Sequence, residues 1–168
     1  TEGRVQIGEV VLDHLDEEEK SVFRRRKIGF IFQNYNLAPM LNIYENIVFP
    51  LTLDGRKPDE ELLRSIISFL RLEDLLDAFP GELSGGQQQR AAIARALIAK
   101  PPVVLADEPT GNLDTIAGRD VMALLRMMSK KYGQTVVMIT HNEELAQMAD
   151  QIIRLEDGKI VGEHHAGE

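Results

Sequence analysis

The sequence predicts an α/β fold, a parallel sheet with helices on both of its faces. Three short apolar segments, 28–32, 103–106 and 136–139, alternate with stretches of helical periodicity, an order typical of α/β sheets. The last two segments are apolar at every position, which predicts strands in the interior of a parallel sheet. Polar side chains follow each segment directly, where parallel strands place their functional groups.

Composition indicates one soluble globular domain. The chain has 168 residues, of which 43% are hydrophobic and 27% charged, enough to bury a substantial core. A net charge of −8 argues against nucleic acid as a partner. The absence of cysteine excludes a disulfide scaffold or a cysteine metal site. No apolar run approaches the ~20 residues that span a bilayer, and no signal-peptide pattern opens the chain, so a cytoplasmic domain is expected.

The first elements are one or two short strands and a helix. Alternating apolar residues between positions 5 and 12 suggest the strands. The helix is predicted over 16–27, because Asp16 can cap its start. Acidic residues 17–19 lie at the positive end of the helix dipole, and basic residues 24–27 lie at its negative end. The strand at 28–32 follows and stops before Gln33.

The middle of the chain predicts a helical insert between two strands. Residues 34–54 are expected to be irregular, because Pro39 and Pro50 break regular structure. A long helix is then expected from Pro58 to residue 79, where Pro80 and a glycine end it. Its apolar stripe at helical spacing indicates core packing.

The second half returns to alternating helices and strands. Helices are predicted from Ser84 to about residue 100 and over 117–132, each followed by one of the apolar strands. A short helix comes next, and residues 152–161 predict a hairpin around an Asp-Gly turn. His164 and His165 are expected to be exposed to solvent and not to bind metal.

Two adjacent carboxylates end the second apolar strand. Side chains of consecutive residues in extended backbone point in different directions, so Asp107 can hold Mg²⁺ while Glu108 faces an attacking water. Phosphoryl transfer requires this division of roles. A solvated pair at a strand end is the alternative.

Three further groups fit phosphate chemistry. Ser84, Gly85 and Gly86 stand at a helix start, where free amides and glycine backbone can bind an anion. A simple helix cap is the alternative there. Gln33 can bind a metal or a water, and His141 can bind a phosphate or a catalytic water. A single glutamine or histidine is usually structural. Gln33 and His141 become candidates for the site because both stand at the ends of apolar strands.

Five motifs in fixed order identify a resemblance to ATP-binding-cassette (ABC) ATPases. The correspondences are Gln33 with the Q-loop glutamine, 83–87 with the signature motif, 103–108 with the Walker B strand and its catalytic glutamate, 111–114 with the D-loop, and His141 with the H-loop histidine. The triple glutamine after the signature and the 108–114 segment resemble the branch that serves macrolide export, lipoprotein release and antimicrobial-peptide resistance.

The resemblance implies an ATPase subunit with a P-loop NTPase fold, acting with Mg²⁺. Glu108, His141 and Gln33 would be catalytic, and Asp107 and Gln33 would hold Mg²⁺. Ser84, Gly85, Gly86 and Gln87 would contact ATP bound to a second subunit in a head-to-tail dimer, with Asp114 at the seam. A membrane permease would be the other partner, which places the protein on the inner face of the cell membrane, without nucleic acid.

The family's P-loop has no counterpart in this sequence. The pattern Gly-x-x-x-x-Gly-Lys-Ser/Thr is absent, and only 32 residues precede Gln33, whereas a P-loop with its strand and helix needs on the order of 30 residues. We therefore expect a single N-terminally truncated domain over 1–168, inactive alone. Residues 1–33 and 101–163 would form the catalytic core, and about 34–100 the Q-loop, helical subdomain and signature helix.

Two alternatives stay open. One is a pseudo-ATPase or partner-binding fragment that offers only its signature helix. The other is a non-transport ABC ATPase, which the acidic balance and the motif details do not favour.

Overall fold

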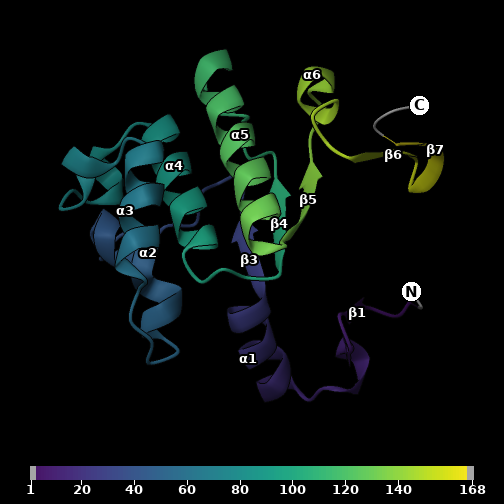
Figure 1. Ribbon diagram of the computed structural model, residues 1–168, viewed down its shortest axis with the longest axis horizontal. Coiled ribbons are helices and arrows are strands. Elements are labelled where there is room, and N and C mark those ends of the chain that lie inside the picture. The colour runs from purple at the N-terminus through teal and green to yellow at the C-terminus, as the bar shows by residue number, and fades with distance from the viewer. Residues whose placement is uncertain (1–2, 166–168) are drawn as a thin grey trace.

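A three-stranded parallel sheet lies at the centre of the computed structural model, which describes residues 3–165 (Figure 1). Its strands are β3 (Ile28–Ile31), β4 (Val103–Asp107) and β5 (Thr135–Ile139), in the order β3-β4-β5. All three run parallel, and Phe30 stands opposite Leu105, which stands opposite Val137. The predicted α/β class is confirmed.

One face of this sheet carries the core. Residues of alternate positions, including Ile31, Val104 and Ala106, are buried there against α4 (Gly85–Leu97) and α5 (Thr115–Tyr132). The opposite positions are more open, and Val137 and Ile139 of β5 are 51% and 64% exposed. Segment 136–139 was predicted as an interior strand, which is wrong for the described residues, since β5 has one neighbour and one open face.

A helix crosses the region that the proline pattern predicts as irregular, so that prediction is wrong. Helix α2 (Ile43–Thr52) begins with a capping box between Asn42 and Glu45 and contains Pro50. Five of its residues are buried, among them the apolar Ile43, Ile47 and Leu51. Their burial contributes about 1.5–3 kcal/mol each, which outweighs the roughly 3 kcal/mol cost of an interior proline.

The predicted long helix is shorter than the sequence suggests. Helix α3 (Glu60–Phe69) is capped by Asp59 and ends before Arg71, which has a left-handed backbone with φ of 53°. Two 3₁₀ turns follow, at Glu73–Leu75 and Pro80–Glu82. The apolar residues after α3 still reach the core, since Leu72 is fully buried, but they do so from turns.

The remaining elements follow the predicted pattern with small shifts in their ends. Strands β1 (Gln6–Ile7) and β2 (Val10–Val11) pair antiparallel, a 3₁₀ turn covers Leu12–His14, and α1 (Glu17–Lys27) starts at a capping box on Asp16. Helix α5 begins two residues earlier than predicted, because Asp114 caps it. It ends at Gly133, whose left-handed φ of 64° suits glycine.

A hairpin closes the described chain. After the short α6 (Glu143–Ala146), strands β6 (Gln151–Glu156) and β7 (Lys159–His165) pair around Asp157 and Gly158, both with positive φ. The hairpin lies apart from the three-stranded sheet (Figure 1). His164 and His165 are exposed, as predicted. Among the helices of residues 3–165, none has the length and apolar character needed to cross a bilayer.

Candidate nucleotide site

A carboxylate and a histidine meet at the carboxyl edge of the sheet. Glu108 follows β4 with a left-handed φ of 47°, and its amide donates to the Ile139 carbonyl at 3.0 Å. Its Oε1 accepts from the His141 amide at 3.0 Å and lies 2.7 Å from His141 Nδ1. The Glu108 side chain is 15% exposed and that of His141 84%. The fold therefore brings together two predicted site residues from neighbouring strands.

Both contacts use the same carboxylate oxygen. The His141 tautomer with its proton on Nδ1 donates to Oε1, as the backbone amide does. Among the described residues, Glu108 Oε2 has no hydrogen-bond partner. One oxygen of Glu108 thus fixes the side chain, and the other is free to accept from a water.

The segment after Glu108 turns towards Gln33. The Gly111 amide donates to the Glu108 carbonyl at 3.1 Å, and Asn112 Nδ2 donates to the Gln33 carbonyl at 3.4 Å. Asp114 then accepts from the Ala117 amide at 2.9 Å as the cap of α5. Gln33, the 111–114 segment and Glu108 therefore form one continuous neighbourhood, while Asp114 itself faces the start of α5.

The start of α4 has the predicted cap. Ser84 Oγ accepts from the Gln87 amide at 3.4 Å, and Gln87 Oε1 accepts from the Ser84 amide at 2.8 Å. Gly86 lies close to the 111–114 segment, because a Cβ added there would stand 3.4 Å from Leu113 Cδ2. The capping reading of Ser84 is thus correct, and it leaves the amide of Gly86 at an open helix start.

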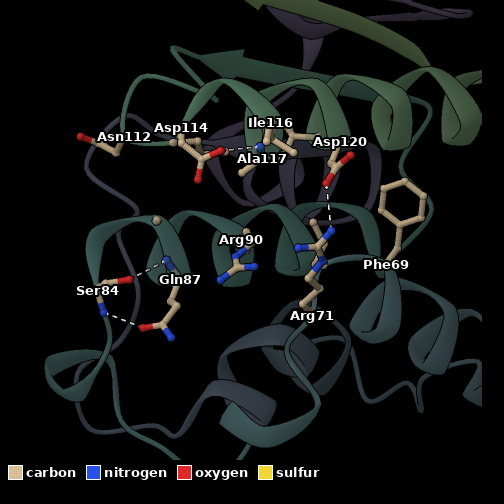
Figure 2. Close-up of a pocket in the computed structure, with 14 residues that line it drawn as sticks. Phe69, Arg71, Ser84, Gln87, Arg90, Asn112, Asp114, Ile116, Ala117 and Asp120 are labelled. Carbon is tan, nitrogen blue, oxygen red and sulfur yellow. Dashed lines mark hydrogen bonds and ion pairs between the residues drawn. The ribbon is translucent and has the colours of Figure 1, made fainter.

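A pocket of about 500 Å³ opens beside this helix start (Figure 2). Ser84, Gln87 and Arg90 line it from α4, and Asp114 and Asp120 line it from α5. Arg71 closes the far end through an ion pair with Asp120 at 3.4 Å. Residues predicted for the signature motif and for the D-loop therefore share one pocket, which neither Glu108 nor His141 lines.

The donor groups fit a magnesium ion that is shared with a phosphate ligand. Within residues 3–165, no three His, Asp or Glu side chains gather as a metal cage. Asp107 offers a carboxylate at the end of β4, and Gln33 an amide oxygen just after β3. Mg²⁺ in phosphoryl-transfer sites keeps several waters and phosphate oxygens and takes few protein ligands, so two donors suit this ion.

One residue near the site was not singled out from the sequence. The half-buried Arg95 of α4 donates to the carbonyls of Tyr35 and Asn36, just after Gln33. Burial lowers the pKa of this guanidinium. The only signal in the sequence is one cation within the otherwise apolar run 91–97, which gives no hint of its partners.

Three features are typical of a nucleotide hydrolase of the cassette type. They are the parallel sheet, the carboxylate–histidine pair at its edge and the glycine-rich helix start. The chain belongs to the ABC transporter family, whose model matches residues 1–111. Its class of activity is ATP hydrolysis coupled to transport.

Relatives of known sequence cover nearly the whole chain. The ABC transporter ATP-binding protein MJ0796 of Methanocaldococcus jannaschii is 43% identical over 166 residues, which are 95% of this chain and 71% of that protein. The macrolide export ATP-binding/permease protein MacB of Rhodopirellula baltica is 40% identical over 95% of this chain and 24% of its own. The bacitracin export ATP-binding protein BceA of Halalkalibacterium halodurans is 38% identical over 99% of this chain and 66% of its own.

A solved structure of MJ0796 shares the fold. This dimeric cassette, described as a post-hydrolysis state bound to ADP and phosphate, superposes with a TM-score of 0.91 at 40% identity. The match covers 100% of this chain and 75% of that chain.

Proposed function

We propose that this chain is the ATP-binding and ATP-hydrolysing part of an exporter-type ABC transporter, acting at the inner face of the cell membrane through a permease. The observation that carries the proposal is the contact of 2.7 Å between Glu108, which follows the strand that resembles Walker B, and His141, which follows β5. Relatives named for macrolide and bacitracin export support the exporter branch.

Each side chain of the sheet edge has a role in this proposal. Glu108 accepts a proton from the attacking water through its free Oε2, while His141 holds Oε1 and so orients the carboxylate. Gln33 positions the water and, with Asp107, would hold the Mg²⁺ that accompanies ATP. The metal, when bound, neutralises phosphate charge. Because Glu108 is mostly buried, its orientation is set before the substrate arrives.

The signature helix serves a second copy of the chain. Neither Glu108 nor His141 lines the pocket beside Ser84, Gly86 and Gln87, which supports a site shared between two copies. A head-to-tail dimer provides such a site, with Asp114 at the seam, and a dimeric relative supports this arrangement. The domain division follows: residues 1–33 and 101–163 form the catalytic core, and about 34–100 the part that carries the signature helix.

One alternative rests on the signature helix alone, whose start lines the pocket through Ser84 and Gln87. In that alternative, the chain is a partner-binding module that presents its signature helix to another ATPase and does not hydrolyse ATP itself. A non-transport ABC ATPase is less well supported, because the named relatives are transporter components.

An ATPase assay on two forms of the chain tests the proposal. One form is the chain itself, and the other, the P-loop form, carries the P-loop strand and helix of MJ0796 joined ahead of Thr1. We expect hydrolysis in the P-loop form and none in the chain itself, because the β- and γ-phosphates need a backbone cradle and a lysine. A folded P-loop form without turnover would contradict the enzymatic proposal and favour the partner-binding module.

A further inference from the structure

Arg95 ties the signature helix to the loop that follows Gln33. It lies on α4, eleven residues after Ser84, and its two terminal nitrogens take different carbonyls. Nη1 donates to Asn36 O at 2.5 Å, and Nη2 donates to Tyr35 O at 2.8 Å. Hydrogen bonds from a charged donor are stronger than neutral ones, and the half-buried setting limits competition from water.

The carbonyls that Arg95 holds belong to an unusual stretch of backbone. Tyr35 and Asn36 have left-handed φ values of 61° and 49°, a conformation that costs a residue such as tyrosine about 1–2 kcal/mol. The loop keeps this shape with short local bonds, from the Tyr35 amide to Phe32 O at 3.1 Å and from the Asn36 amide to Asn34 O at 2.6 Å. The turn directly after Gln33 therefore depends on outside support.

The same loop touches α4 at a second point and α2 at a third. A Cβ added to Gly85 would stand 2.7 Å from Tyr35 Oη, so the tyrosine packs directly on the helix start. Downstream, Asn46 of α2 holds residue 38 through two bonds, Ala38 amide to Oδ1 at 2.7 Å and Nδ2 to Ala38 O at 3.1 Å. Among the described side chains, only Arg95 therefore donates hydrogen bonds to the carbonyls of residues 35 and 36.

We propose that Arg95 is a positioning residue that holds the turn at 35–36 on α4, so that Gln33 and the signature helix start keep a fixed relation. No acidic side chain of the described residues pairs with Arg95. Its charge is directed at the two carbonyls alone. The consequence for catalysis rests on the proposed function, but the structural role of Arg95 does not.

Hydrogen exchange on the chain itself, resolved by residue, tests this inference. In Arg95→Gln, we expect exchange of the Tyr35 and Asn36 amides to rise by about tenfold or more, while the amides of β4 keep their rates. Arg95→Lys keeps the charge but not the two-pronged donor, so its increase should be smaller and confined to the same amides. Arg64→Gln, on the exposed face of α3, is the matched control and should change neither.

Every outcome of this experiment decides the inference. Unchanged exchange at residues 35 and 36 in Arg95→Gln overturns it, and so does an equal rise in β4, which would mean general destabilisation. If Arg95→Gln does not fold, Arg95→Lys decides alone, with a confined rise in support and a uniform or absent rise against.

A second arm connects Arg95 to the reaction. In the P-loop form, Arg95→Lys should raise the Mg²⁺ concentration needed for half-maximal hydrolysis. The melting temperature should stay close to that of the parental P-loop form. An unchanged Mg²⁺ dependence in an active enzyme would overturn the link to Gln33. Absence of hydrolysis in the parental P-loop form would instead count against the proposed function, and the exchange result would stand by itself.

Discussion

Glu108 combines a left-handed backbone with a carboxylate that is bonded on one oxygen only. The φ of 47° turns the chain away from β4 immediately after Asp107, so the two carboxylates separate. His141, at the end of the neighbouring strand, donates its backbone N–H to Glu108 Oε1 and places Nδ1 beside the same oxygen. This geometry leaves Glu108 Oε2 without a hydrogen-bond partner among the described residues. In the proposed function this oxygen accepts from a water, and Asp107 takes the metal.

Replacing Glu108 by glutamine separates turnover from binding. In the P-loop form, Glu108→Gln keeps the Oε1 acceptor for His141 but removes the negative charge that accepts a proton. We expect kcat to fall by about 10²–10⁴-fold, the usual contribution of a general base, with Mg-ATP affinity retained in calorimetric titration. Asp107→Asn is the matched comparison and should weaken Mg-ATP binding as well. Parental turnover in Glu108→Gln would exclude this residue as the base.

The sequence predicted which residues stand at this edge but not how they touch. Asp107, Glu108 and His141 each follow an apolar strand, so their shared placement follows from topology. The left-handed backbone of Glu108 is not encoded in the residue type, because glutamate rarely adopts it. The bonds of Arg95 to Tyr35 and Asn36 join positions about 60 apart in the chain, and no local pattern indicates them.

Helix α4 packs on β3 through a glycine. A Cβ added to Gly29 would lie 2.5 Å from the Ala96 carbonyl oxygen and 3.0 Å from Pro101 Cγ. The first of these is backbone, so the clash cannot be relieved by a side-chain rotation. This contact brings the signature helix against the strand that precedes Gln33, and therefore sets the distance between the two motifs.

A methyl group at position 29 should therefore be costly. We expect Gly29→Ala to lower the free energy of unfolding by about 1–3 kcal/mol, the usual range for overpacking, measured by urea denaturation. Gly81→Ala is the matched control, because an added Cβ there meets no atom within 4 Å and φ is not positive. Equal stability of the two variants would show that α4 can move away from β3 freely.

An ion cluster joins the end of α1 to the end of α2. Arg26 Nε lies 2.8 Å from Asp54 Oδ1, and Arg25 Nη2 lies 3.2 Å from the same oxygen. The hydrogen bond from Arg26, with the charges of both arginines, holds the pKa of Asp54 below its usual range. The folded state thus binds the proton of Asp54 less readily than the unfolded chain does.

The stabilisation from Asp54 should fade in acid. Because its folded pKa is lowered, the contribution is complete above the unfolded value of about 3.9. It is lost as the pH falls from there through the folded value. Asp54→Asn should therefore lower the melting temperature at pH 7, and the difference from the parent should shrink below about pH 4. Asp77→Asn, at an exposed position, is the control, and a pH-independent difference for Asp54→Asn would contradict the assignment.

Helix and strand predictions failed where burial overrode local signals. Pro50 predicts a break in the chain, but the buried residues of α2 keep the helix around it. The apolar stripe after Phe69 suggested a continuous helix, yet a left-handed turn at Arg71 ends α3 while the stripe continues into the core. The apolar pattern after Phe69 therefore indicated burial correctly and secondary structure incorrectly, whereas at Pro50 the prolines alone led to the wrong prediction.

At the scale of the whole molecule, the proposed site consists of two separate groups of residues. The Glu108–His141 pair stands at the sheet edge, and the pocket of Ser84, Gly86 and Gln87 opens between α4 and α5 (Figure 2). The 108–114 segment runs between them and contributes Asp114 to the pocket. Our account is that two copies exchange these groups, so that each complete site contains residues from both chains.

Mixing two inactive variants of the P-loop form tests this claim most directly. Glu108→Gln lacks the base but keeps its signature helix. Ser84→Asp keeps a good helix cap but places a negative charge where the partner's phosphate would bind. In mixed dimers, one of the two sites would combine an intact Glu108 with an intact Ser84. The account predicts ATP hydrolysis by the mixture well above the sum of the two variants measured alone, whereas no gain on mixing would show that both groups act within one chain and would contradict it.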